Sequence, residues 1–245
     1  APAPFALTLK IEIPWSQATD THTVRIELLD EVQVEACNLY SGTDLPLQPA
    51  LFVELHGSEA GTREQAEALA EIAARHGGTR FAWATSTEER NTLWRARHDA
   101  YYAALNLEPG ASGWVTDVCV PISCLAECVL ESRRDVESSF LKAPIVGHVG
   151  DGSFHLALLV DPADPAQVAE ARRLNDRLLE RALAHGGTTT GEHGVGFGKI
   201  AALEQEHGPG VDVMRAIKAA LDPYSILNPG KIFATSRNHE AGVIS

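Results

Sequence analysis

The chain has 245 residues, of which 44% are hydrophobic and 22% charged, and its formal net charge at pH 7 is −13. These values are typical of a globular protein with a sizeable core. The negative charge argues against a surface for nucleic acid or anionic lipid, because both need clustered lysines and arginines. No apolar run reaches transmembrane length and no signal peptide opens the chain, so we expect a cytoplasmic protein, membrane-associated only through partners.

The four cysteines lack the C-x-x-C spacing of structural zinc sites; they are Cys37, Cys119, Cys124 and Cys128. Their neighbours are apolar, and a free cysteine in such surroundings behaves as a small hydrophobic residue. We therefore expect core thiols in a reducing compartment.

The first part of the chain is predicted to alternate between strands and helices. Apolar and polar residues alternate in short runs, which is typical of half-buried strands. The expected strands are 7–13, 25–29, 50–55 and 81–84, with a loop at 14–23. The expected helices run from Asp30 to about Tyr40, from the capping-box pair Thr62 and Gln65 to His76, and from Ser86 to about Leu105.

The second part begins with a run of β-forming residues at 112–120. Pro121 then stands at a first-turn position, where proline is tolerated, and predicts a helix to about Val136. The remaining expected elements are a hairpin at 143–160, a helix from Asp164 to about His185, short helices at 199–206 and 211–221, and a closing turn at 227–232.

The sequence His-Gly-Gly-Thr closes a helix twice, at 76–79 and at 185–188. Each time it follows a strand and a capped helix, and an extended segment comes next. This repetition predicts one α+β domain with a ferredoxin-like fold: a duplicated split βαβ with an antiparallel sheet and helices on one face. The paired glycines are expected to be helix C-caps, and their histidines to have no catalytic role.

Residues 148–155 read His-Val-Gly-Asp-Gly-Ser-Phe-His. Asp-Gly between β-forming residues predicts a two-residue type I′ turn at 151–152. This register would place His148 directly opposite His155, with Cβ atoms about 4.5–5.5 Å apart on one face of the sheet. Two imidazoles at that distance can hold one metal ion; the alternative is an ordinary polar cross-strand pair.

The stretch 188–199 supplies further polar candidates among four glycines. Catalytic zinc sites use three protein ligands and leave one position open, and His148, His155 and Glu192 would form such a set. His193, directly after Glu192, would then be a general base. Lys199 either begins a helix at the surface or reaches an anion held by the glycine loop.

Arg97 lies on the apolar stripe of the helix expected at 87–105. An arginine in that position is costly unless its charge is paired. One interpretation is structural: the guanidinium pairs with Asp99, Asp117 or a backbone carbonyl, or extends to solvent. The other is functional, since a guanidinium is the usual two-point clamp for a carboxylate.

Three stretches together resemble the C-terminal domain of FAD-linked oxidases of the vanillyl-alcohol-oxidase type. They are the 148–155 stretch, Gly-Glu-His-Gly-Val-Gly-Phe-Gly-Lys at 191–199, and Leu-Asp-Pro-Tyr-Ser-Ile-Leu-Asn-Pro-Gly-Lys-Ile at 221–232. Within that family the chain is similar to the cytochrome-linked D-lactate dehydrogenases, a likeness supported by residues 25–30, 52–58, 93–99 and 116–121. It extends over roughly residues 24–233.

The resemblance implies a ferredoxin-like substrate domain that covers the isoalloxazine ring of FAD in a D-2-hydroxyacid dehydrogenase. D-Lactate would be oxidised to pyruvate, with hydride transfer to flavin N5. His148, His155 and Glu192 are implied ligands of a divalent metal, Zn or Mn, which would hold the hydroxyl and carboxylate oxygens of the substrate. His193 is the implied base for the hydroxyl proton, and Arg97 the implied carboxylate clamp.

The resemblance also carries over Gly191 and Asn228 as cofactor-binding positions. The chain departs from the family at several places. Ser153 stands where the family commonly has asparagine. Val115 lies near a position where glycolate and 2-hydroxyglutarate relatives often have lysine, which favours a small substrate without a second carboxylate. Segment 14–23 is too short for the helix expected there.

In this family an N-terminal domain binds FAD with a glycine-rich pyrophosphate loop, and nothing in residues 1–24 matches it. We therefore expect a fragment or subunit that is inactive alone. Its expected partners are a small 2-hydroxy acid, the FAD-binding domain and an electron acceptor: a cytochrome, a quinone or an electron-transfer flavoprotein. Two other hypotheses stay open, a stand-alone metal-dependent hydrolase and a non-catalytic subunit that binds a small acid or a partner.

Overall fold

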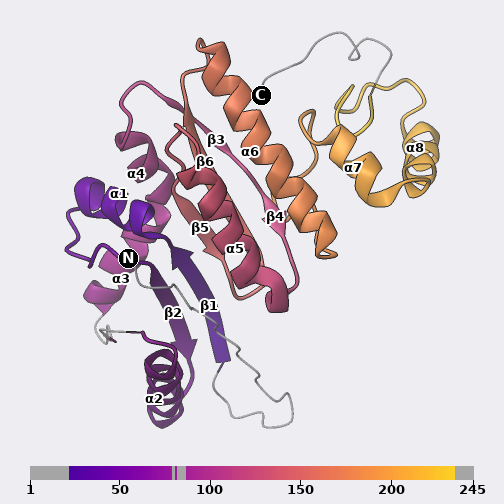
Figure 1. The fold of residues 1–245 in the computed structure, drawn as a ribbon. Coiled ribbons are helices and arrows are strands. Elements are labelled where there is room, and N and C mark those ends of the chain that lie inside the picture. Colours follow the sequence, from indigo (N-terminus) through magenta and orange to yellow (C-terminus); the bar gives the residue numbers. More distant parts are fainter. Residues whose placement is uncertain (1–21, 79–80, 82–86, 235–245) are drawn as a thin grey trace.

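The computed structural model describes residues 22–78, 81 and 87–234 (Figure 1). In these residues, six strands form one antiparallel sheet with the order β2-β1-β5-β6-β3, and β4 also pairs with β6. The strands are β1 His22–Leu29, β2 Ala50–His56, β3 Ser112–Val115, β4 Val118–Cys119, β5 Ile145–His148 and β6 Ser153–Val160.

The described helices lie on both faces of this sheet. They are α1 Glu31–Ser41, α2 Glu59–Arg75, α3 Thr87–His98, α4 Ala100–Asn106, α5 Ile122–Glu137, α6 Pro165–Ala184, α7 Ile200–His207 and α8 Gly210–Leu221. Figure 1 shows α5 and α6 side by side over one face. None of these helices combines the length and the apolar character needed to cross a membrane.

Residues along β6 alternate between the two faces of the sheet, as pleating requires. Phe154, Leu156 and Leu158 pack with α5 and α6 in the main core, whereas Ala157 and Leu159 pack with α4 on the opposite face. Ser153 and His155 share the α4 face, nearer the hairpin turn. The whole strand is buried, which holds these two polar residues in a fixed place.

Several predicted helix boundaries are confirmed. The carboxylate of Asp30 accepts a hydrogen bond from the Gln33 amide and caps α1, and Asp164 caps α6 in the same way. Helix α5 follows Pro121 as expected, and α7 and α8 match the two short helices. These boundaries depend on local hydrogen bonds and so can be predicted from short sequence patterns.

Two predicted helix boundaries are wrong. Ser58 caps α2, and Thr62 lies inside the helix, where its hydroxyl donates to the Ser58 carbonyl at 3.0 Å. The helix expected at 87–105 is two helices that meet at Asp99. The β-rich run at 112–120 is likewise divided, because residues 116–117 lie between β3 and β4.

The predicted antiparallel sheet is confirmed, but the placement of helices on one face is wrong, because α4 packs on the face opposite α5 and α6. One split βαβ is present: α5 connects β4 to β5, and β6 lies between them, antiparallel to both. Of the two repeated units, the second is β6, α6 and the segment after it, where Thr188 forms only an isolated bridge with Cys119. The first would end in strand 81–84, of which only Phe81 is described, and strand 7–13 also lies outside the described residues. The duplication therefore stays a prediction.

All four cysteines lie in the described ranges and are free. Cys37 and Cys128 are buried, which confirms them as core thiols, whereas Cys119 and Cys124 are half-buried. Burial raises the pKa of the Cys128 thiol to about 11. A thiol with so high a pKa carries almost no thiolate at neutral pH and is a poor nucleophile.

The β5–β6 hairpin has a four-residue turn, so the predicted two-residue turn is wrong. His148 pairs with Ser153, and His155 pairs with Val146. The Asp151 amide donates to the His148 carbonyl at 3.2 Å, and the Asp151 carboxylate accepts from the Ser153 amide at 2.9 Å. Gly152 is the turn residue with positive φ, at 96°, whereas a type I′ turn requires positive φ at two positions.

We expect Gly152→Ala to lower the free energy of unfolding by at least about 1–2 kcal/mol, because its positive φ disfavours a side chain. The added Cβ would also lie 2.1 Å from the Val120 carbonyl oxygen. Gly150→Ala, two residues away, is the matched control: the nearest atom to its Cβ is 3.7 Å away, on Ile26. Urea unfolding of both variants measures the difference, and equal losses would contradict this account of the turn.

Candidate functional site

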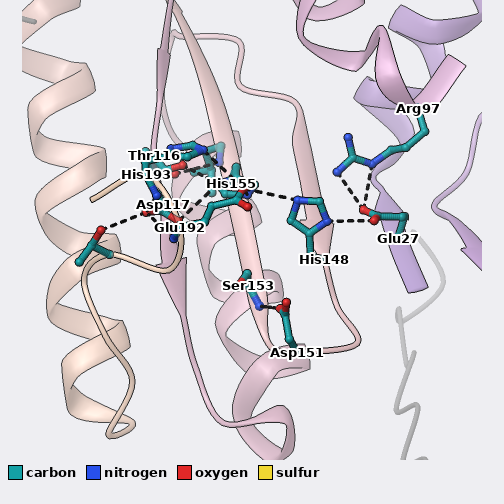
Figure 2. A network of polar contacts seen from close by, with 12 residues as sticks. Glu27, Arg97, Thr116, Asp117, His148, Asp151, Ser153, His155, Glu192 and His193 are labelled. Atoms are coloured by element: carbon teal, nitrogen blue, oxygen red, sulfur yellow. Dashed lines mark hydrogen bonds and ion pairs between the residues drawn. The ribbon is translucent and has the colours of Figure 1, made fainter. Parts of the chain in front are cut away.

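Two histidines of the hairpin lie on one face of the sheet, His148 at the end of β5 and His155 in β6 (Figure 2). Because His148 pairs with Ser153, the histidines are diagonal neighbours rather than directly opposed. Their ring centroids are 5.8 Å apart and the rings are nearly perpendicular, at 82°. The four-residue turn therefore changes the predicted register but keeps both imidazoles on the same face.

Each imidazole forms a hydrogen bond with another group of the protein through Nδ1. His155 Nδ1 lies 2.9 Å from the Thr116 carbonyl oxygen, and His148 Nδ1 lies 2.9 Å from Glu27 Oε1. A carbonyl oxygen and an ionised carboxylate only accept hydrogen bonds, so Nδ1 is the donor in both rings. The lone pair of a neutral imidazole is then on Nε2, the atom left to bind a metal or a proton.

Glu192 brings a carboxylate oxygen to these two nitrogens. Its Oε1 lies 3.0 Å from His155 Nε2 and 3.4 Å from His148 Nε2. His155 Nε2 is buried and has no hydrogen-bond partner among the residues the structure describes. Burial lowers the pKa of His155, which favours the neutral ring. The pKa of His148 is raised instead, chiefly by its hydrogen bond to Glu27. A proton on His148 Nε2, or a metal cation among the three atoms, would relieve the repulsion between these facing acceptors.

These three residues therefore fit a divalent metal. Their ligand atoms lie within 4.8 Å of one another. Two imidazole nitrogens and a carboxylate oxygen are donors that zinc and manganese accept. A second group that satisfies the same distance is Asp117, His155 and His193. It fits less well, because Asp117 is already engaged by other donors.

Asp117 is fully buried and organises the loop that carries Glu192 and His193. Its carboxylate accepts from the His193 amide at 2.9 Å, from the Glu192 amide at 3.2 Å and from Lys199 Nζ at 3.1 Å. Burial alone would raise the pKa of Asp117, but these hydrogen bonds and the lysine charge hold it below its ordinary value. Lys199 is thus an internal ion-pair partner, not a free surface lysine.

His193 lies next to the converging ligand atoms. Its ring stacks on His155, with centroids 4.8 Å apart and an interplanar angle of 14°. Its Nε2 is 3.5 Å from Glu192 Oε1, and its side chain is half-exposed. The predicted base is therefore beside the candidate metal ligands, as Figure 2 shows.

The two predicted cofactor positions differ in their surroundings. Gly191 approaches the core so closely that a Cβ there would lie 2.9 Å from Asp117 Oδ1 and 3.2 Å from Ser153 Oγ. Asn228 is exposed, with φ of 47°, and its carbonyl accepts from the Lys231 amide. It belongs to the segment after α8, and within the described part of the chain no hydrogen bond or ion pair joins it to the histidines, so its cofactor role stays a prediction.

Arg97 pairs with Glu27 of β1, not with either of the aspartates considered from sequence. Its Nε and Nη2 lie 3.0 and 2.8 Å from Glu27 Oε2. Burial raises the pKa of Glu27, but the hydrogen bonds from His148 and Arg97 outweigh it and leave the pKa lowered. Strand alternation could have indicated this acid, because Glu27 shares its face with the buried Leu29.

Asp117 was also missed from sequence as an organiser of the site. We expect Asp117→Ala to lower the free energy of unfolding by about 3–5 kcal/mol, because it leaves the Lys199 ammonium and two loop amides without their acceptor. Asp176→Ala removes an exposed carboxylate from α6 and is the matched control. Denaturant unfolding compares the two, and similar stability in both variants would refute the anchoring role.

Comparison with known proteins places this chain in a family. A model of the C-terminal domain of FAD linked oxidases matches residues 16–232. The probable mitochondrial D-lactate dehydrogenase of Danio rerio is 46% identical over 216 residues, which cover 88% of this chain and 44% of that protein. The mitochondrial D-lactate dehydrogenase (cytochrome) of Arabidopsis thaliana is 44% identical over 209 residues, 85% of this chain and 37% of that protein.

A third relative is the glycolate oxidase subunit GlcD of Escherichia coli (strain K12), 30% identical over 213 residues, 86% of this chain and 42% of that protein. The chain therefore spans less than half the length of these relatives. Two of the three are mitochondrial by name, so they do not confirm the expected cytoplasmic location.

Solved structures show the same fold at low identity. The 4-ethylphenol oxidase from Gulosibacter chungangensis superposes with a TM-score of 0.64 at 17% identity, over 87% of this chain and 48% of that chain. For p-cresol methylhydroxylase the TM-score is 0.59 at 15% identity, over 87% and 47%. Together with the match over residues 16–232 and the 46% identity of a relative, this likeness shows that the chain belongs to the FAD linked oxidases and contains their C-terminal domain.

Proposed function

We propose that this chain is the substrate- and metal-binding domain of an FAD-dependent D-2-hydroxyacid dehydrogenase that oxidises D-lactate to pyruvate. The observation that carries the proposal is the convergence of His148 Nε2, His155 Nε2 and Glu192 Oε1 around one point. Relatives named D-lactate dehydrogenase and glycolate oxidase support it, because lactate and glycolate are both small 2-hydroxy acids.

Arg97 and Val115 are the proposed determinants of substrate choice. The bonds to Glu27 use Nε and Nη2 of Arg97, so the Nη1 edge can bind the substrate carboxylate. Val115, at the end of β3, brings no charge for a second carboxylate. This combination favours a monocarboxylic acid such as lactate over a dicarboxylic one.

The chemistry is divided between this chain and the groups it would hold. A divalent metal, Zn or Mn, bound by His148, His155 and Glu192 would lower the pKa of the substrate hydroxyl, and FAD would supply N5 as the acceptor of the Cα hydride. His193 takes the hydroxyl proton on an imidazole nitrogen and passes it to solvent across its exposed side. Asp117 fixes the backbone of Glu192 and His193 by accepting hydrogen bonds from their amides, and so holds the carboxylate ligand and the base at a constant distance from each other.

The proposed enzyme needs further partners. FAD would be held mainly by an FAD-binding domain, with Gly191 and Asn228 as proposed contacts from this chain. Electrons would leave the flavin for a cytochrome, a quinone or an electron-transfer flavoprotein. Two alternatives are a stand-alone hydrolase and a non-catalytic subunit. The two experiments that follow distinguish the proposed dehydrogenase from both.

Metal content tests the ligand set. We expect His155→Ala and Glu192→Ala each to remove most of the metal that the chain retains after loading with Zn²⁺ or Mn²⁺ and dialysis, because each deletes one of three ligands. His98→Ala, an exposed histidine at the end of α3, should retain its metal. Mass spectrometry of the dialysed proteins gives the ratio, and full metal content in both ligand variants would rule out this site.

Turnover tests the reaction. Together with an FAD-binding domain, the protein should reduce an artificial electron acceptor with D-lactate and leave L-lactate untouched. His193→Gln should lower kcat by at least about 100-fold, since it removes the base, while metal content stays unchanged. A protein that bound FAD yet reduced no acceptor with D-lactate would contradict the dehydrogenase, and rapid ester hydrolysis by the chain alone would favour the hydrolase.

A further inference from the structure

Glu27 is a buried acid that the proposed ligand set does not use. Its side chain, on β1, is only 4% exposed. One carboxylate oxygen, Oε1, accepts from His148 Nδ1 at 2.9 Å, and the other, Oε2, accepts from Arg97 Nε at 3.0 Å. Burying a carboxylate is costly even when both oxygens are paired, and an apolar side chain would fill the same space at a lower cost. Packing alone therefore does not explain an acid at this position.

We propose that Glu27 is a positioning residue that sets the orientation and tautomer of His148. Its carboxylate holds the Nδ1 proton, so that Nε2 presents its lone pair to Glu192 Oε1, 3.4 Å away. The same carboxylate fixes Arg97, and so joins the proposed substrate clamp to the proposed metal ligand. This inference rests on the proposed function and extends it to an acid outside the ligand set.

The backbone places Glu27 for this role. In the β1–β5 ladder Glu27 is directly opposite His148, and Leu29 is opposite Val146. Residues opposite each other on neighbouring strands point to the same face. The carboxylate and the imidazole therefore meet because of strand register, and Figure 2 shows Arg97 reaching the same carboxylate from the other side.

The two histidines differ in how much they need such a partner. His155 is 7% exposed, stacks on His193 and donates Nδ1 to a backbone carbonyl. His148 is 36% exposed at the end of its strand. The buried ring is held by packing on several sides, whereas the orientation of the half-exposed ring depends on its bond to Glu27.

A purely structural role for Glu27, neutralising Arg97, makes a different prediction. Glu27→Leu alone would leave a buried guanidinium unpaired and would mix the two roles. The double variant Glu27→Leu/Arg97→Met replaces the ion pair by apolar side chains, an exchange that often preserves stability. Glu27→Gln/Arg97→Met keeps a neutral acceptor for His148 Nδ1. The matched control, Glu170→Leu/Arg173→Met, removes an ion pair on α6.

The probe is Zn²⁺ alone, titrated into the metal-free chain against a chromogenic chelator, with thermal unfolding of every variant as a check of folding. We expect the Leu/Met variant to bind Zn²⁺ about 10–100-fold more weakly than wild type, the Gln/Met variant to lie between them, and the α6 control to match wild type. If the Leu/Met variant does not fold, weakened binding by the Gln/Met variant carries the test. Affinity within about twofold of wild type in every folded variant overturns the proposal.

The tautomer of His148 gives a second readout, which needs no metal. Nitrogen-15 NMR of the metal-free chain should show His148 and His155 both protonated on Nδ1, and the Leu/Met variant should lose this preference at His148 only. An unchanged His148 tautomer overturns the positioning role. If wild type binds neither Zn²⁺ nor Mn²⁺, the proposed function fails, and the tautomer measurement alone then decides whether Glu27 orients His148.

Discussion

The buried carboxylate of Asp117 is the interaction on which the rest of the site depends. It joins the sheet to a loop 75 residues further along the chain, through the amide of Glu192. This acceptor holds the glycine-rich loop against the sheet together with the Thr188–Cys119 bridge and the stack of His193 on His155, and its own charge is balanced by Lys199. The candidate carboxylate ligand and the candidate base are therefore placed by an internal ion pair, independently of any bound metal.

Strand order supplies the other half of the arrangement. Because β5 lies between β1 and β6, side chains from three neighbouring strands meet on one face: Glu27, His148 and His155. Each acts on the next through a short contact or through Glu192, so the polar network runs across the sheet rather than along any one strand. The opposite face of β5 and β6 contributes Ile145, Phe154 and Leu156 to the main hydrophobic core.

Features set by short-range chemistry were predictable from sequence. The caps Asp30 and Asp164 and the existence of the hairpin follow from local patterns, and family motifs indicated the site residues. The hairpin register was not predictable, because the same residues suit a two-residue turn and the observed four-residue turn, in which Asp151 accepts from the Ser153 amide and Gly152 packs against the distant Val120. Partners 70 and 82 residues apart, Arg97 with Glu27 and Lys199 with Asp117, were also missed, since charge patterns do not specify which distant residue completes a pair.

The alternation along β6 has a consequence for how such a domain can change over evolutionary time. His155 stands between Phe154 and Leu156, both of them core residues, so few substitutions near it leave the core intact. The loop with Glu192 and His193 is exposed and joined to the sheet mainly through backbone amides, which most side chains leave available. The site thus has one half fixed by core packing in the sheet and another half, in the loop, whose backbone is held through amides, so the side chains of Glu192 and His193 are left to face the site.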